Sequence, residues 1–469
     1  MKYLQAGVVC CLASMCLILA TKSAWGQRQY PNIIIILTDD QGYADVGFNG
    51  STDIATPGID RIADNGVVCT NAYVSFAVCG PSRAGLITGR YQDRFGFSRN
   101  PLLAPKDSTM GLPATEETLA AFLKRSGYTS GILGKWHLGA HPSQHPNQKG
   151  FDEFFGFLEG GHRYFPEEWT LNDISEARQQ YDGYRTKMVR NQTVVEETEY
   201  LTDALSREAV AFVKRNRSNP FFLFVAYTAP HAPLQPTEKY LSRHAHITDE
   251  RRRTYAAMVS AVDDGVNDLL NTLQALNIEE NTLVFFLSDN GGPTKDNASS
   301  NKPLRGFKGD FYEGGVRVPF AVQWKGVLPA GTKYHQPVIS LDIFGTAAAL
   351  TGARPKNEID GVNLIPYLTG AAAGPPHDAL YWRGSNSEKW AVRTPDEKMV
   401  VISGKQQVYD IRVDVGEKND ISTSVPQHSK QLQALLDHWK ERLVPPAFLG
   451  LLDDKRYSEL NPDRFAPNK

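Results

Sequence analysis

Four short apolar runs, each ending in charged or imidazole side chains, constrain the fold of this chain most. The first, residues 32–40, has four consecutive isoleucines and a leucine before two aspartates. Unbroken apolar runs of this length are typical of strands buried on both faces of a parallel sheet. The other three follow the same plan: GYTSGILGKWHLG (127–139), NPFFLFVAYTAPHAP (219–233) and NTLVFFLSDNGG (281–292).

Helical patterns lie between these runs. Residues 115–127 combine an N-terminal threonine, early glutamates, apolar spacing and a final glycine, and residues 201–216 and 255–276 are similar. Strands that alternate with helices predict an α/β fold, a doubly wound, mixed but mostly parallel sheet flanked by helices. Ligands bind such sheets beyond the carboxyl ends of the strands. We therefore expect the side chains that end the four runs to meet in one site.

The 469 residues divide into three predicted parts. Residues 1–26 are typical of a signal peptide, because a lysine precedes an apolar run and small residues precede Gln27. Residues 27–370 form the predicted catalytic domain. After a Gly/Ala/Pro-rich linker, residues 371–469 form a predicted small α+β subdomain, an antiparallel sheet with a helix, and a tail. The sequence thus predicts an exported protein, periplasmic or secreted, with no stable membrane anchor.

Charge and cysteine content narrow the possible partners. The chain has a formal net charge of −2 and lacks a long basic run, so nucleic acid is not an expected partner. Three of the five cysteines lie in the predicted signal peptide, which leaves Cys69 and Cys79. Two cysteines do not make a disulfide framework. Cys69 lies in strand-like apolar sequence and is interpreted as a core residue.

Two acidic pairs predict a metal site. Asp39 and Asp40 end the first apolar run, and Asp289 and Asn290 end the last. Taken alone, each pair suits a turn or a helix cap equally well. Together, at matched strand ends, they favour one divalent cation with oxygen ligands, Ca²⁺ or Mg²⁺.

Three cationic and two imidazole side chains complete the candidate site. Arg83, Lys135 and Lys308 together suit a tetrahedral anion, since arginine offers a planar fork and lysine a point charge. His137 and His231 are candidates for proton transfer, because imidazole titrates near neutral pH. The alternative for each histidine is a structural role in the core.

The segment CGPSRAGLITGR, residues 79–90, carries a resemblance to a known family. It matches every fixed position of the C-x-P-S-R-x-x-L-x-T-G-R signature of the type I, formylglycine-dependent sulfatases of the alkaline-phosphatase superfamily. GKWHLG, APHAP, SDNGG and LRGFKGDFYEGGVRVP follow in the family's order, so the resemblance covers about residues 32–368. The layout is most similar to secreted bacterial polysaccharide sulfatases. QVYDIRVDVGEKNDIS looks like the family's C-terminal strand and acidic turn.

The resemblance implies a modified nucleophile and one bound Ca²⁺. A formylglycine-generating (sulfatase-maturating) enzyme would convert Cys79 to 3-oxoalanine, Cα-formylglycine, whose hydrate attacks sulfur and forms a covalent sulfo-enzyme intermediate. The implied metal ligands are Asp39, Asp40, Asp289 and Asn290, with residue 79 adjacent.

The resemblance also implies a ring of side chains around the sulfate. We assign His231, helped by Lys308, to protonating the departing alcohol, and His137 to accepting the proton when sulfate is released. Lys135 would stabilise charge on the sulfuryl oxygens. The residues implied around the sulfate are Arg83, Lys135, His137, His231 and Lys308.

The predicted substrate is a sulfated carbohydrate, with a carrageenan-type galactan ahead of a glycosaminoglycan. In the insertion FLEGGHRYFPEEW (157–169), His162 and Arg163 are candidates to contact sugar hydroxyls or a second sulfate, and Tyr164 or Trp169 to stack on a sugar. Arg99 is a further candidate. The alternative for the insertion is an ordinary surface loop. Alternative functions are a phosphatase, phosphodiesterase or phosphonate hydrolase of the same superfamily, or a non-catalytic glycan-binding relative.

Overall fold

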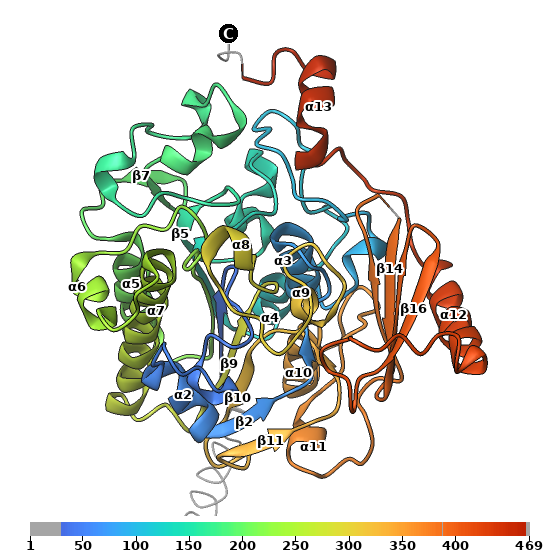
Figure 1. The fold of residues 1–469 in the computed structure, drawn as a ribbon. Coiled ribbons are helices and arrows are strands. Elements are labelled where there is room, and N and C mark those ends of the chain that lie inside the picture. Colours follow the sequence, from blue (N-terminus) through green and yellow to red (C-terminus); the bar gives the residue numbers. More distant parts are fainter. Residues whose placement is uncertain (1–29, 387, 466–469) are drawn as a thin grey trace, which may run out of the picture.

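A ten-stranded mixed sheet crosses the centre of the computed structural model, which describes residues 30–386 and 388–465 (Figure 1). The predicted signal peptide lies outside the described residues. In spatial order the strands are β11 (Thr332–Tyr334), β2 (Gly66–Cys69), β10 (Phe320–Gln323), β9 (Thr282–Ser288), β1 (Asn32–Thr38), β8 (Phe221–Ala226), β4 (Thr129–Lys135), β5 (Glu153–Phe157), β6 (Met188–Arg190) and β7 (Thr193–Val195).

Parallel pairing dominates the middle of this sheet. Strand β1 runs parallel to β8 and β9, and β4 runs parallel to β5 and β8. Antiparallel pairs occur toward the edges, where β10 pairs with β9 and β2, and β6 pairs with β5 and β7. The predicted α/β fold with a mixed, mostly parallel sheet is confirmed, and the carboxyl ends of the central strands lie at one edge.

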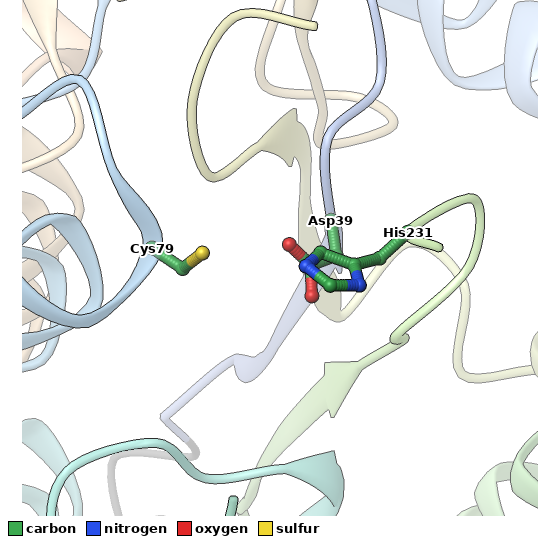
Figure 2. A group of neighbouring side chains, drawn as sticks. All are labelled: Asp39, Cys79 and His231. Carbon is green, nitrogen blue, oxygen red and sulfur yellow. The ribbon is translucent and has the colours of Figure 1, made fainter. Parts of the chain in front are cut away.

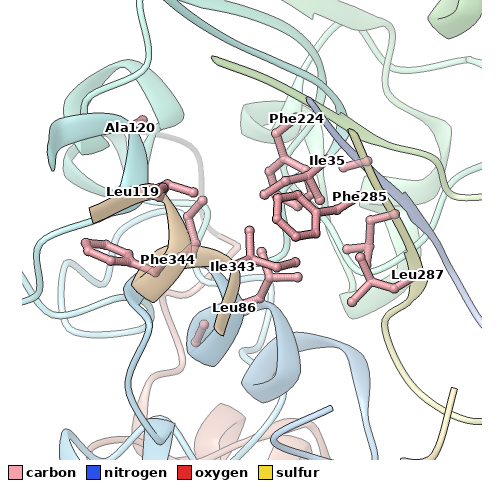
Figure 3. Close-up of a cluster of buried hydrophobic side chains, with 14 of the residues drawn as sticks. Ile35, Leu86, Leu119, Ala120, Phe224, Phe285, Leu287, Ile343 and Phe344 are labelled. Carbon is pink, nitrogen blue, oxygen red and sulfur yellow. The ribbon is translucent and has the colours of Figure 1, made fainter. Parts of the chain in front are cut away.

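The isoleucine run forms β1 because both faces of this strand are covered. Side chains alternate across a strand, so Ile33, Ile35 and Leu37 enter one core and Ile34 and Ile36 enter the other, all fully buried. Each such side chain contributes about 1.5–3 kcal/mol by leaving water. Figure 3 shows the first core, where Ile35 and Phe285 lie opposite Leu86 and Ile343 from the covering helices.

Helices cover both faces. The first core is closed by α3 (Cys79–Thr88), α4 (Leu119–Lys124) and α10 (Asp342–Thr351). The second is closed by α2 (Pro57–Asp64), α5 (Leu201–Asn216) and α7 (Glu250–Ala275). Shorter elements are β3 (Ala72–Tyr73), α6 (Glu238–Leu241), α8 (Thr294–Asn297), α9 (Glu313–Val316), β12 (Val338–Ile339) and α11 (Ile365–Leu368). No helix in the described ranges is both long and apolar enough to cross a bilayer.

The helix predicted over residues 115–127 is shorter than expected. Thr118, not Thr115, caps α4, and its Oγ1 accepts a hydrogen bond from the Ala121 amide at 3.1 Å. The glutamates interpreted as first-turn residues lie before the helix. There Glu116 pairs with Arg90 at 2.5 Å and Glu117 with Arg125 at 3.0 Å. Tertiary ion pairs therefore hold this segment outside the helix.

The C-terminal subdomain is a four-stranded antiparallel sheet with a packed helix, at the right of Figure 1. Its sheet starts at Leu380, so the first strand begins inside the Gly/Ala/Pro-rich stretch of residues 369–382 that the sequence indicates as a linker. The boundary at residue 370 stays a prediction. The elements are β13 (Leu380–Arg383), β14 (Lys389–Arg393), β15 (Glu397–Ile402), β16 (Lys405–Asp410), α12 (Pro426–Lys440) and, in the tail, α13 (Asp454–Leu460).

Candidate active site

The polar strand ends meet at one edge of the sheet, as the sequence predicts. Asp39 follows β1, Lys135 ends β4, and Asp289 follows β9. The ligand atoms of Asp39, Cys79 and His231 all lie within 4.8 Å of one another. Figure 2 shows the Cys79 sulfur turned toward the other two side chains, although the three come from separate segments.

An oxygen-lined pocket lies at the centre of this site. One carboxylate oxygen from each of Asp39, Asp40 and Asp289 lies within 4.8 Å of the others. Asp39 Oδ1 and Asn290 Oδ1 are buried and have no hydrogen-bond partner. Buried polar oxygens are normally paired, and hard oxygen donors are what Ca²⁺ and Mg²⁺ bind. The donor set therefore fits a divalent cation of this class.

The charge balance of the pocket also fits a cation. Burial and the nearby Asp39 charge raise the pKa of Asp289 to about 6. Burial alone would raise the pKa of Asp40 as well, but Lys308 and His231 outweigh it and hold that pKa at about 2. A divalent ion would relieve the repulsion among these carboxylates.

Asp40 is held in a backbone conformation that few non-glycine residues adopt. Its φ is 64°, in the left-handed region. The Asn297 amide donates to the Asp40 carbonyl at 3.0 Å, and the Asn290 amide donates to Asp40 Oδ1 at 2.7 Å. Lys308 Nζ lies 2.7 and 2.9 Å from the two Asp40 oxygens. These contacts compensate the backbone cost and aim the carboxylate into the pocket.

Two further cations lie beneath the carboxylates. Lys135, fully buried, places Nζ 2.5 Å from Asp39 Oδ2. Arg83 Nε donates to Asp289 Oδ2 at 2.9 Å, and its Nη1 donates to the Lys135 carbonyl at 3.1 Å. Arg83 thus ties the carboxylate after β9 to the end of β4, and its buried Nη2 has no hydrogen-bond partner.

Both predicted histidines lie at the site, and the surroundings of each lower its pKa. Burial and the neighbouring Lys135 hold the pKa of His137 well below its usual range, and its Nδ1 has no hydrogen-bond partner. Burial lowers the pKa of His231 to about 4. His231 Nδ1 lies 2.5 Å from the Ala232 carbonyl, so the neutral ring carries its proton there, and Nε2 lies 3.6 Å from Asp40 Oδ2.

Cys79 begins α3 and is 2% exposed. Burial raises the pKa of its thiol, although Lys135 and Lys308 act in the opposite direction. Thiolate nucleophiles occupy environments that lower this pKa. The burial of Cys79 is therefore not typical of a cysteine that attacks a substrate as an unmodified thiolate.

The side chains of His162 and Trp169, both predicted to bind substrate, are buried within the insertion. His162 is fully buried, with Nδ1 2.7 Å from the Arg163 carbonyl and Nε2 2.8 Å from the Thr186 carbonyl. Trp169 Nε1 donates to the same Arg163 carbonyl at 2.9 Å. Both side chains fasten the insertion to itself, so we do not carry them forward as sugar contacts.

The remaining predicted substrate residues are placed differently. Tyr164, a suggested stacking platform, is buried, and its hydroxyl donates to the His231 carbonyl at 2.8 Å, which supports the His231 loop. Arg163 is partly exposed and pairs with Glu168 at 3.1 Å. Arg99 pairs with Asp453 at 2.9 Å and lines a cavity of about 220 Å³ that Val78, the residue before Cys79, also lines.

Comparison with known proteins assigns the family. The family model Sulfatase matches residues 31–353, more than half of the chain. The chain belongs to the sulfatase family. N-acetylgalactosamine-6-sulfatase from Homo sapiens is 36% identical to this sulfatase over 362 residues, which cover 74% of this chain and 67% of that protein. Sulfatases are sulfuric ester hydrolases, so the chain is an enzyme of that class.

Solved structures agree with this assignment. Ps i-CgsB in complex with k-i-k-neocarrahexaose is 38% identical, with a TM-score of 0.86 over 93% of this chain and 100% of that chain. Phosphonate monoester hydrolase of Agrobacterium radiobacter is 20% identical, with a TM-score of 0.64 over 88% of this chain and 96% of that chain, and it shares the fold. The predicted family is confirmed.

Sequence reasoning missed four neighbours of this sulfatase's site. A methyl group on Gly160 would lie 2.7 Å from His137 Nε2, and one on Gly161 would lie 2.8 Å from the Tyr184 hydroxyl. Glu159, just before them, is 6% exposed, and burial raises its pKa to about 8. The Glu-Gly-Gly triplet follows β5 at the same sheet edge, a signal of close backbone approach that could have been read from the sequence.

Proposed function

We propose that this sulfatase carries formylglycine in place of Cys79, binds one Ca²⁺, and removes sulfate from a sulfated carbohydrate, a carrageenan-type galactan. The observation that carries the proposal is the convergence, at one sheet edge, of Cys79, the oxygen pocket and two lysines. Cys79 holds the first position of the signature helix, and burial raises the pKa of its thiol, which disfavours direct thiolate attack.

The pocket residues would hold the metal. Once present, formylglycine would supply a hydrated aldehyde as nucleophile and Ca²⁺ a Lewis-acidic charge beside the sulfate. Lys135 pairs with Asp39 and Arg83 with Asp289, and these contacts hold the two carboxylates in place. The proposed ligands are Asp39, Asp40, Asp289 and Asn290.

The cations and histidines would act on the sulfate ester. Lys135 and Lys308 offer positive charge to the sulfuryl oxygens, where negative charge develops in the transition state. His231 and Lys308 approach the site from the same side, since both contact Asp40. A bound sulfate raises the pKa of neighbouring imidazoles, which brings His231 toward proton donation and lets the unpaired Nδ1 of His137 accept a proton.

The carbohydrate assignment is supported by relatives and by aromatic residues near the site. Ps i-CgsB, which aligns over nearly the whole chain, was solved with a neocarrahexaose. Tyr184 lies against Gly161, and its ring makes an edge-to-face contact with Tyr181 at 5.6 Å between centroids. Tyr181 is 58% exposed. We propose that this pair stacks on a sugar ring of the substrate.

The experiment compares matched esters and a substrate panel. Purified enzyme with Ca²⁺ is expected to turn over an aryl sulfate much faster than the matching phosphate, and Cys79→Ala is expected to abolish sulfate release. Faster phosphate turnover, or full activity of Cys79→Ala, would overturn the proposal. Carrageenan oligosaccharides are expected to be desulfated in preference to glycosaminoglycan oligosaccharides, and the reverse order would reassign the substrate. Tyr181→Ala should reduce oligosaccharide hydrolysis more than aryl sulfate hydrolysis.

We also propose that the chain is exported and that a formylglycine-generating enzyme modifies it. N-terminal sequencing of protein from the periplasm or medium should start at Gln27. An intact N-terminus on membrane-bound protein would contradict export through a cleaved signal.

A further inference from the structure

The loop that carries Lys308, residues 305–314, contacts the catalytic segments along one side. Gly309 N donates to the carbonyl of Ala77, two residues before Cys79, at 2.9 Å. Lys308 N lies 3.5 Å from the carbonyl of Gly292, two residues after Asn290. The loop thus contacts both the segment before Cys79 and the segment after Asn290. Its position therefore determines where the Lys308 ammonium lies.

The other side of the same loop is attached to the C-terminal subdomain. Arg305 Nη1 donates to the Glu417 carbonyl at 2.8 Å and to the Tyr409 hydroxyl at 3.1 Å. At the far end of the loop, Glu313 N donates to Glu417 Oε2 at 2.6 Å. Glu417, in the acidic turn after β16, therefore holds both ends of the loop. The ends also join each other, because Gly314 N donates to the Arg305 carbonyl at 2.6 Å.

A buried lysine completes this attachment. Lys398, on β15, places Nζ 2.8 Å from Glu313 and 3.2 Å from Glu417, and all three side chains are fully buried. The second Glu313 oxygen accepts from the Tyr73 hydroxyl at 2.7 Å and lies 3.2 Å from Arg317. Buried charges cost free energy unless each is paired, and paired charges define one geometry sharply. The cluster therefore fixes the subdomain against the base of the loop in one register.

The subdomain also contacts the middle of the loop, where the Tyr312 hydroxyl donates to Gln407 Oε1 at 2.5 Å and Lys389 lies 3.7 Å from Asp310. The apolar part of the interface, which includes Tyr73 and Trp382, packs the subdomain onto the domain as a whole. The lysine side chain is a flexible four-carbon stem, so the position of its backbone limits where the ammonium can lie. Arg305, Glu417 and Lys398 make the contacts that hold the two ends of the loop.

We propose that Arg305, Glu417 and Lys398 are positioning residues that set the reach of Lys308. They hold the loop so that the ammonium meets Asp40 and the sulfate ester. The inference rests on the proposed sulfatase reaction, because Lys308 has its role there. It makes the C-terminal subdomain part of the catalytic apparatus.

The test is a double-mutant cycle between Arg305 and Lys308, with kcat/KM on an aryl sulfate as readout. Arg305 is exposed, so we expect Arg305→Gln to fold, which circular dichroism checks. A misplaced catalytic group costs up to about 100-fold, and we expect a loss of at least about 10-fold, in kcat rather than KM. In a Lys308→Ala background the same change should cost less than about 2-fold, because no ammonium remains to be misplaced.

Control variants separate the positioning of Lys308 from general stabilisation of the fold. Arg412→Gln removes an exposed arginine of the C-terminal subdomain that lies 2.7 Å from Asp410 and makes no contact with the loop among the described residues, and it should leave both kcat and KM at wild-type values. The same double-mutant cycle is repeated with Lys398→Met, which removes the buried lysine of the attachment. Its kinetics are compared once circular dichroism shows a native fold. Equal losses in both backgrounds, or full activity of Arg305→Gln, would overturn the inference. Wild-type activity on the same ester tests the proposed function separately.

Discussion

Replacing Lys135 by methionine tests how the site balances its charges. Methionine keeps most of the buried volume but removes the ammonium 2.5 Å from Asp39 Oδ2. The same oxygen then has only Arg83 Nη2 at 3.7 Å. Breaking a buried pair by removing one partner costs about 3–5 kcal/mol of stability, because the other charge stays buried. Domains are stable by about 5–15 kcal/mol, so the variant should fold with a clearly lowered midpoint.

The loss of activity has a separate origin and size. Removing one charge-stabilising group from an active site costs about 100- to 1,000-fold in kcat, or about 2.7–4 kcal/mol. The assay combines urea denaturation with aryl sulfate kinetics at a temperature where the variant is fully folded. Ca²⁺ should restore part of the lost stability, since the ion pairs with Asp39, but it should not restore kcat.

A matched control exists in Lys149. This lysine is also buried, its ammonium donates to the Leu112 carbonyl at 2.7 Å, and burial lowers its pKa to about 8. Lys149→Met should change stability by no more than about 3 kcal/mol and leave kcat/KM at the wild-type value. Wild-type kcat in folded Lys135→Met, or an equal loss of kcat in Lys149→Met, would refute the charge-stabilisation argument.

Three further predictions concern the metal, the site wall and pH. Chelation should abolish activity and lower stability by about 2.7 kcal/mol relative to protein with Ca²⁺ at 100 times its Kd; unchanged melting with and without chelator would contradict the oxygen site. Gly160→Ala should displace the His137 ring and lower kcat about 100-fold, whereas normal kinetics would show that the ring tolerates the methyl. His377 lies 2.7 Å from Asp342, and this carboxylate raises its pKa against the opposing effect of burial. The pair therefore contributes its full stability to the folded protein below the unfolded pKa of about 6.5, and this contribution falls as pH rises through the folded pKa. In urea titrations, His377→Gln should lower the free energy of unfolding most at low pH. A loss of stability that does not depend on pH would refute this.

The core site was predictable because the fold gathers it. Parallel strands place their carboxyl ends at one edge, so Asp39, Lys135, His231 and Asp289 could be expected to meet before any geometry was known. Residue type then limited the chemistry to an oxygen-ligated cation and an anion. The nucleophile position needed the additional information in the signature around Cys79, because a lone cysteine has no such meaning by itself.

The substrate-binding residues were less predictable, because residue type does not tell which way a side chain points. His162 and Trp169 have the chemistry of sugar contacts, yet both turn inward onto a backbone carbonyl of their own loop. The insertion instead reaches the site through Gly160 and Gly161, whose lack of side chains allows His137 and Tyr184 to approach. Tyr184 lies 23 residues after Gly161, and no local pattern predicts that contact.

The predicted start of α4 was wrong for a related reason. Local pattern placed the cap at Thr115, but Arg90 from an earlier segment and Arg125 at the far end of α4 pair with the glutamates that follow it. Tertiary contacts overrode a local preference worth about 1 kcal/mol. Likewise, the buried cluster of Glu313, Lys398 and Glu417 brings together residues far apart in sequence, and only the folded chain reveals that they hold the Lys308 loop.

The chemical state of residue 79 tests the central claim most directly. Mass spectrometry of the tryptic peptide spanning residues 62–83, from protein active on an aryl sulfate, reports it without relying on kinetics. We predict a peptide about 18 Da lighter than the unmodified sequence, with fragment ions that place the loss at residue 79 and leave Cys69 intact. A fully active enzyme whose residue 79 remains an alkylatable cysteine would contradict the account.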